Sequence, residues 1–273
     1  METKSNLTKR QIQKLAQGGV KCMQPGIESL SGAQLKEMDK GVSPLQNIQC
    51  LKWSRYYNLD VSWNILLGFP QETDVDYQRQ LDLIPSLFHL QPPESTARFW
   101  LERFSPYFKW PERYGIRLLG PGLAYEYVYD ERKVDLNKIA YDFEYEIDWK
   151  VSPHLYKELN DLIQEWKHRY TSPNRPFLYF AKALSYLTVF DGRQPTPTSE
   201  RFDGPFAFIL EFCNDQPKSF EQIRKGLQEE ELVSMGFAIQ PLADVLKVLI
   251  GKRLLYEEGG RFFTLALPVN PHR

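Results

Sequence analysis

Two apolar runs that stop abruptly organise the first half of the chain. The first lies around residues 20–23 and ends at Pro25-Gly26, and the second covers 61–67 and ends at Gly68-Phe69-Pro70. Runs that are apolar at nearly every position are typical of strands buried on both faces of a parallel sheet. Proline has no N–H to donate to a neighbouring strand, and glycine lets backbone or ligand come close. We therefore expect each strand to end at these residues. The helical pattern between them predicts a strand–helix–strand unit.

The remaining pattern predicts alternating helices and strands, then a change of character after Gly204. There, three helices and a Glu258-Gly259-Gly260 hairpin make a winged-helix pattern. The proline-rich stretch 192–199 is expected to be a linker. The expected helices cover 6–18, 33–40, 44–57, 74–87, 155–170, 206–214, 219–228 and 241–252, and the expected strands cover 95–105, 141–150, 177–180, 184–190, 254–257 and 261–267.

Candidate chemistry follows the two apolar runs. Glu28 follows the first, where a carboxylate can accept hydrogen bonds from ribose hydroxyls or pair with an ammonium group. The alternative is an acidic cap for the next helix, with Ser29 or Ser31 as N-cap. Asn64 interrupts the second run. Because a buried side-chain amide needs hydrogen-bond partners, we expect Asn64 to face a polar lumen, the interior of a barrel of strands.

The turn after the second run has two readings. Gly68 would let backbone amides approach a flat ligand, and Phe69 or Pro70 would stack on it. The alternative is an ordinary strand-to-helix turn with Thr73 as N-cap.

Two further features carry open alternatives. Alternation along 95–105 places Arg98 and Glu102 on one face. If this face lines the interior of a barrel of strands, the two side chains contact a substrate. If the strand is an edge strand, the charged face is exposed to solvent. The aromatic, Gly/Pro-rich segment 108–129 cannot form a regular helix; it either shapes a peptide-binding cleft or packs over the barrel. Isolated residues such as His89 and Cys50 are expected to be structural.

The segments QPGIESLS (24–31) and MDKGVSPLQNIQCLKWSRYYNLDVSWNILLGFPQET (38–73) resemble the later barrel strands of cobalamin-dependent radical S-adenosylmethionine enzymes. The nearest type is the peptide C-methyltransferase that matures ribosomally made peptides, and LERFSPYF (101–108) fits the same family. The resemblance implies an S-adenosylmethionine site that contains Gln24 and Glu28, and it implies substrate contacts from Arg98 and Glu102. It adds Asn64, Gly68, Phe69 and Pro70 to the cofactor site, whereas no catalytic residue and no metal ligand is assigned.

The chain departs from that family in its cysteines. The family's CxxxCxxC motif, which holds a four-iron cluster through thiolates, is absent, and Cys22, Cys50 and Cys213 share no motif. The resemblance therefore implies the carboxyl-terminal part of a larger enzyme. A second polypeptide would supply the [4Fe-4S] cluster and cobalamin, and a ribosomal precursor peptide would be the substrate.

Composition excludes several other classes. The net charge is −1, and the expected wing carries Glu257 and Glu258, so we expect no nucleic-acid partner. No apolar run approaches the ~20 residues of a bilayer span, and the polar first residues are no secretory signal, so we expect no membrane partner. Three scattered cysteines argue against a disulfide framework, which leaves the reducing cytoplasm as the expected compartment.

These observations predict an α/β protein: a partial (β/α) radical-SAM-type barrel over 1–129, a cap and linker region over 130–202, and a small winged-helix-like domain over 203–273. The expected function is the S-adenosylmethionine- and substrate-binding half of a radical methyltransferase that is inactive alone. The alternative is a non-catalytic module that binds a precursor peptide, or an inactive fragment.

Overall fold

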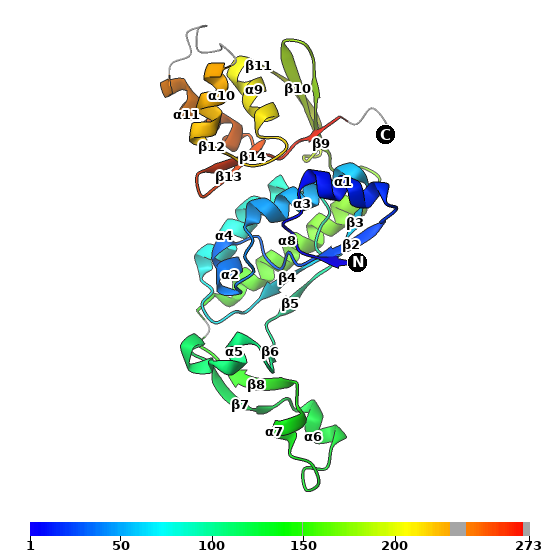
Figure 1. Cartoon of the computed structure of the whole chain (residues 1–273), viewed down its shortest axis with the longest axis vertical. Coiled ribbons are helices and arrows are strands. Elements are labelled where there is room, and N and C mark those ends of the chain that lie inside the picture. Colours follow the sequence, from blue (N-terminus) through cyan, green and yellow to red (C-terminus); the bar gives the residue numbers. More distant parts are fainter. Residues whose placement is uncertain (149, 230–238, 270–273) are drawn as a thin grey trace.

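The computed structural model describes residues 1–148, 150–229 and 239–269. It shows three parts along the long axis: a central layered unit, an arm at one end and a carboxyl-terminal unit at the other (Figure 1). Helices and several sheets alternate throughout, which confirms the α/β prediction.

The central unit is built on short parallel strands. β1 (Glu2–Thr3), β2 (Cys22–Pro25) and β3 (Asp60–Val61) pair in that order, and β4 (Asn64–Leu67) pairs with β5 (Ser95–Arg98). A parallel bridge between Glu28 and Ile65 joins the two groups. β1 and β5 do not pair with each other, so the described strands form an open sheet and no closed barrel.

Helices cross between successive strands, and their caps explain where they begin. Thr8 and Ser43 form capping boxes with Gln11 and Gln46, which start α1 (Lys9–Gln17) and α3 (Pro44–Tyr57). Ser31 is the N-cap of α2 (Gly32–Glu37), as one of the two sequence readings expected. The unit also contains α4 (Asp74–Leu83), η1 (Ile84–Ser86) and α8 (Pro153–Thr171).

Strand alternation separates the two faces of this sheet. Met23, Val61 and Ile65 are fully buried and belong to the main core with Leu51 and Trp53 of α3. Their neighbours in the chain point to the opposite face, which is exposed along β2 and half-buried along β4. The opposite, open face carries Gln24 and Asn64 together with Leu66, and it is the face on which a ligand can reach the strands.

The strand expected over 95–105 is wrong in its length. It divides into β5 and β6 (Leu101–Glu102), which belong to different sheets, because β5 pairs with β4 whereas β6 pairs with β8 (Asp142–Glu146). Together with β7 (Arg117–Pro121), β6 and β8 form the sheet of the arm. The arm has its own small core around Phe99, Leu101 and Phe143.

The aromatic segment of the arm forms only short helical turns between its strands. They are α5 (Pro106–Lys109), η2 (Pro111–Tyr114), α6 (Ala124–Val128) and α7 (Leu136–Ile139).

The described residues of the carboxyl-terminal unit combine two sheets and three helices. β9 (Leu178–Lys182), β10 (Tyr186–Asp191) and β11 (Thr198–Asp203) are antiparallel, and residues 192–197, expected to be part of a linker, are the turn of the β10–β11 hairpin. The expected last strand also divides, because β15 (Leu267–Pro268) leaves β14 (Arg261–Thr264) and pairs with β9. The other elements are α9 (Gly204–Phe212), β12 (Lys218–Ser219), α10 (Phe220–Glu229), α11 (Ile239–Gly251) and β13 (Leu255–Glu258).

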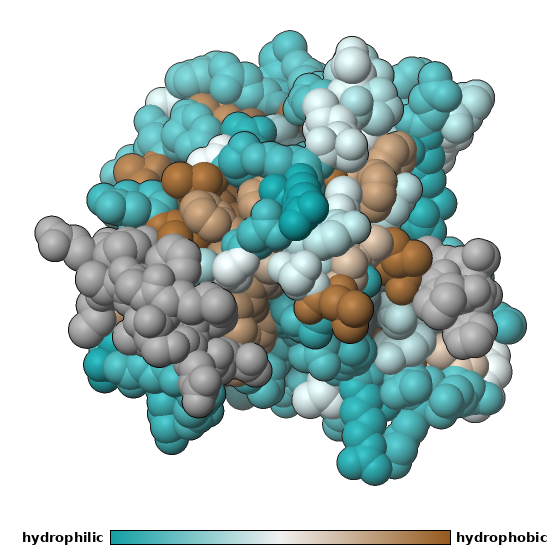
Figure 2. Space-filling view, turned by 90° about the horizontal axis from the view of Figure 1, so that it is seen from above, coloured by the Kyte–Doolittle hydropathy of each residue, from teal (hydrophilic) through white to brown (hydrophobic). Residues whose placement is uncertain are grey.

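The surface of the carboxyl-terminal end is mainly hydrophilic, with separate hydrophobic areas (Figure 2). On the arm, large apolar side chains such as Trp100, Phe104 and Tyr127 are exposed. Among the described residues, no helix has both the length and the apolar character that a membrane crossing requires.

Candidate functional site

The structure brings three of the expected cofactor-site residues together. Gln24, Glu28 and Asn64 line one pocket of about 250 Å3 beside β2 and β4. Gln24 and Asn64 lie on β2 and β4, and Glu28 lies on the bridge that connects them. The rest of the lining is Glu2, Thr3, Pro25, Gly26, Ile27 and Trp63.

Glu28 has an unusual backbone in this pocket. Its φ of 58° lies in the left-handed region, which is uncommon for residues other than glycine, asparagine and aspartate. Its carbonyl oxygen accepts from the Leu66 N–H at 2.8 Å, and its carboxylate lies 3.1 Å from the Lys40 ammonium. The bridge to β4 holds this conformation, and the side chain stays about a quarter exposed beside the pocket.

The polar groups of this pocket suit a ligand that donates hydrogen bonds. Asn64 accepts from the Ser95 hydroxyl at 2.8 Å, which fixes its amide across the β4–β5 pair. The carboxylates of Glu2 and Glu28 accept hydrogen bonds, and the amides of Gln24 and Asn64 both donate and accept. Hydroxyl and ammonium groups match this set.

Gly68, Phe69 and Pro70 are not brought into that pocket. The Gly68 N–H donates to Glu72 at 2.8 Å, and Phe69 is 6% exposed because its ring packs 5.0 Å from that of Phe99. The turn after β4 therefore joins the central unit to the core of the arm.

Arg98 and Glu102 do not share a face, which corrects the expectation from alternation. Arg98 ends β5 and lies over the Tyr156 ring of α8 at 5.4 Å. Glu102 lies on β6 in the arm sheet, opposite Asp142. Strand alternation fails as a guide here because the chain changes sheets between the two residues.

A buried polar network behind the sheet was missed from the sequence. Glu72 is 2% exposed and accepts hydrogen bonds from the Gly68 N–H, the Tyr77 hydroxyl and the Gln34 amide. Burial raises the pKa of this carboxyl to about 7. The signal in the sequence was a carboxylate two residues after the Gly-Phe-Pro strand end, with Gln34 and Gln80 on neighbouring helices.

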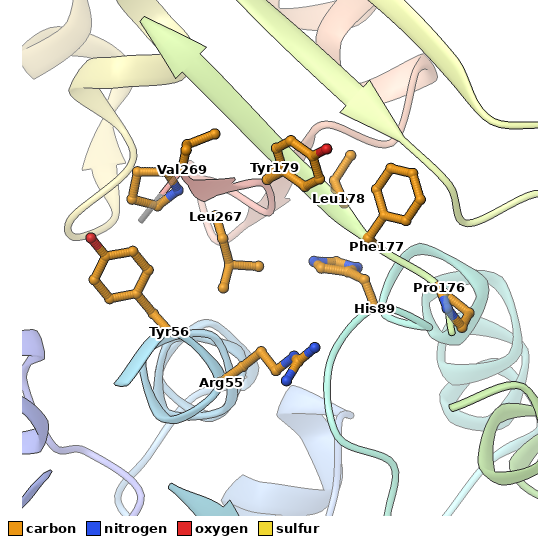
Figure 3. A pocket seen from close by; sticks show the side chains of 10 residues that line it. Arg55, Tyr56, His89, Pro176, Phe177, Leu178, Tyr179, Leu267 and Val269 are labelled. Carbon is orange, nitrogen blue, oxygen red and sulfur yellow. The ribbon is translucent and has the colours of Figure 1, made fainter. Parts of the chain in front are cut away.

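A second cavity, of about 380 Å3, lies between α3 and the β9–β15 pair (Figure 3). Arg55 and Tyr56 come from α3, His89 from the loop before β5, and Tyr179 from β9. His89 donates through Nε2 to the Leu265 carbonyl at 3.1 Å, and burial lowers its pKa to about 3. The neutral ring is therefore a buried part of the contact between the two units.

The three cysteines do not form the donor set of a thiolate-held cluster. Cys22 is exposed on β2, whereas Cys50 and Cys213 are buried, and burial raises the pKa of both thiols to about 12. Within residues 1–148, 150–229 and 239–269, no three His, Cys, Asp or Glu side chains are arranged to hold a metal ion. An iron–sulfur cluster does not fit these residues.

Comparison with known proteins gives one partial similarity. No family model matches the chain. An uncharacterized methyltransferase of Pyrococcus horikoshii is 28% identical over 92 residues, which are 32% of this chain and 20% of that protein. The similarity thus spans about a fifth of the length of the relative.

Proposed function

We propose that this chain is the part of a methyltransferase that binds S-adenosylmethionine and substrate, with the pocket of Gln24, Glu28 and Asn64 as the cofactor site. The observation that carries the proposal is the convergence of these three polar side chains on the open face of a parallel sheet. The partial similarity to a methyltransferase supports the same class.

The chemistry of the pocket matches the polar groups of S-adenosylmethionine. Glu28 accepts from the ribose hydroxyls or pairs with the amino group, and the ion pair with Lys40 orients its carboxylate. Asn64 and Gln24 provide amide contacts from the adjacent strands. Ile27 and Trp63 also line the pocket, but their side chains are buried in the main core.

Replacement of Glu28 by glutamine is expected to weaken the binding of S-adenosylmethionine about 10- to 100-fold, because a charge-assisted hydrogen bond contributes about 1.5–3 kcal/mol. Isothermal titration of the purified chain measures this directly. Glu94→Gln is the matched control, since Glu94 is exposed at the entry to β5 and lies outside the pocket. The proposal is wrong if the unmodified chain binds no S-adenosylmethionine or if both variants bind equally.

A finer part of the proposal concerns the reaction. We propose a methyl transfer to carbon of a ribosomally made peptide at this site, as the resemblance to peptide-maturing cobalamin-dependent radical enzymes implies. The cysteines of this chain do not fit a cluster, so a second polypeptide would supply the [4Fe-4S] cluster and cobalamin. The edges of β1 and β5 carry no further strand among the described residues, and they offer the partner parallel pairing. The carboxyl-terminal unit, winged-helix-like in this proposal, would dock the precursor peptide.

An anaerobic pull-down of this chain from its own cells tests the partner. We expect a co-purifying protein with stoichiometric iron and cobalt, measured by elemental analysis. A chain that carries a small peptide but no metal-containing partner would favour the alternative, a non-catalytic peptide-binding module. A chain with nothing bound would favour an inactive fragment.

A further inference from the structure

A separate cleft of about 670 Å3 lies where the central unit meets the arm. One side comes from α2 and the turn after it, together with Gln71 and Asp76 near the start of α4. The other side comes from α5 and η2 of the arm. None of the residues of the proposed S-adenosylmethionine pocket lines it.

Two carboxylates give this cleft an acidic floor, and a third, whose pKa is raised to about 7, lies beneath them. Glu37 and Asp76 line it, and Glu72 lies beneath, connected through Gln34, which lines the cleft and donates to Glu72 at 2.9 Å. Asp76 is 5% and Glu72 2% exposed, so both are taken almost completely out of water.

These carboxylates have uncharged hydrogen-bond donors but no counter-charge. Glu72 accepts from an amide, a hydroxyl and a backbone N–H, Asp76 from Ser31 and Thr73, and Glu37 from the Gln71 N–H. In the part of the chain that the structure describes, no lysine or arginine lies within ion-pair distance of any of the three, and Lys150 lowers the pKa of Glu37 only from farther away. Asp76 lies in the first turn of α4, where the helix dipole favours a carboxylate, and Glu37 is only half-buried, so a cation from outside the chain can pair with this floor.

Aromatic rings form the opposite wall. The Tyr107 hydroxyl donates to the Glu37 carbonyl at 3.2 Å, and the Tyr107 and Tyr114 rings are 4.4 Å apart. Trp110 is about half exposed at the rim. The Arg113 guanidinium lies 5.7 Å from the Tyr114 ring centre, which is within the range of a cation–π contact.

We propose that this cleft binds the lysine- or arginine-type side chain of a peptide, with the cation between the Glu37–Asp76 floor and the aromatic wall. A long apolar stem with a charged end fits a space that is aromatic on one side and acidic on the other. Lys36 and Arg113 stand exposed among the lining residues, and the acidic side chains outnumber them. The cleft therefore predicts a basic residue in the substrate. Its assignment as a substrate site rests on the proposed function.

Calorimetric titration of the full chain with the capped tripeptides acetyl-Gly-Lys-Gly-amide and acetyl-Gly-Gln-Gly-amide tests the inference. We expect the lysine peptide to bind, the glutamine peptide to bind at least tenfold more weakly, and Glu37→Gln to weaken the lysine peptide about tenfold. Glu112→Gln is the matched control, because Glu112 is an exposed acid on η2 that does not line the cleft.

Equal binding of the two peptides, or equal effects of Glu37→Gln and Glu112→Gln, would overturn the inference. Thermal melting of both variants shows that they are folded. Titration of the same samples with S-adenosylmethionine separates the two proposals. Retained cofactor binding with no lysine preference removes this site alone, whereas lost cofactor binding by the unmodified chain removes the proposed function.

Discussion

Replacement of Lys52 by methionine is expected to lower the free energy of unfolding by about 3 kcal/mol, since several buried acceptors would lose their donor. Lys52 is fully buried on α3, and its ammonium donates to the Asn214 carbonyl and side-chain oxygens and to the Thr264 carbonyl, at 3.1, 2.7 and 2.6 Å. The rings of Trp53 and Phe263 lie within 5.0 Å of the nitrogen. Burial lowers the pKa of Lys52, whereas the three oxygens satisfy all three of its hydrogens.

This lysine joins α3 of the central unit to the carboxyl-terminal unit, so the loss should appear as weaker coupling between them. Urea unfolding followed by circular dichroism measures the change. Lys9→Met is the matched control, because Lys9 is partly exposed and pairs with the exposed Asp215, a contact that contributes less than about 1 kcal/mol. If the two substitutions lower the free energy of unfolding equally, Lys52 does not hold the units together as the structure indicates.

The second large effect is a pH dependence caused by Glu72. Its pKa is about 7 in the folded chain and near the ordinary value of 4.5 in the unfolded chain. Between these values the folded chain holds a proton that the unfolded chain has released, so the free energy of unfolding falls as pH rises from 4.5 to 7. The shift corresponds to about 3 kcal/mol of unfolding free energy.

Urea unfolding at pH 5 and pH 8 tests this in the unmodified chain and in Glu72→Gln. Glutamine keeps an oxygen for Tyr77 or Gly68 and carries no titrating proton, so the difference between the two pH values should shrink by about 3 kcal/mol in the variant. Glu112→Gln, on the exposed surface of the arm, should leave the difference unchanged. An identical pH dependence in unmodified and Glu72→Gln chains would assign the effect to other groups.

Local patterns were sufficient for most helices. α3 has the predicted bounds of Pro44–Tyr57, because Ser43, Pro44 and Gln46 supply a complete start signal within a few residues. The helix expected over 155–170 and the strand expected over 184–190 are present as α8 and β10, since apolar spacing alone specifies their buried faces. The grouping of Gln24, Glu28 and Asn64 depends on the parallel bridge between Glu28 and Ile65, which joins the end of the first apolar run to the second.

The course of the chain after β5 could not be read from local pattern. Residues 95–105 alternate as one strand, but the pairing partners of β5 and β6 lie in different sheets, and pairing is a long-range property. Phe69 has the composition of a stacking residue, and only the position of Phe99 and Tyr107 decides that it is buried instead.

By itself the sequence determined the α/β class, the strand–helix–strand order and the polar residues at the open face, because these depend on neighbours within one or two turns of chain. The tertiary structure alone decided that Glu72, Asp76 and Glu37 gather beside the arm, and that Lys52 reaches Thr264 across 212 positions of sequence. The physical reason is the same in both cases: burial and pKa depend on which distant segments exclude water from a side chain, and no local spacing encodes that distance.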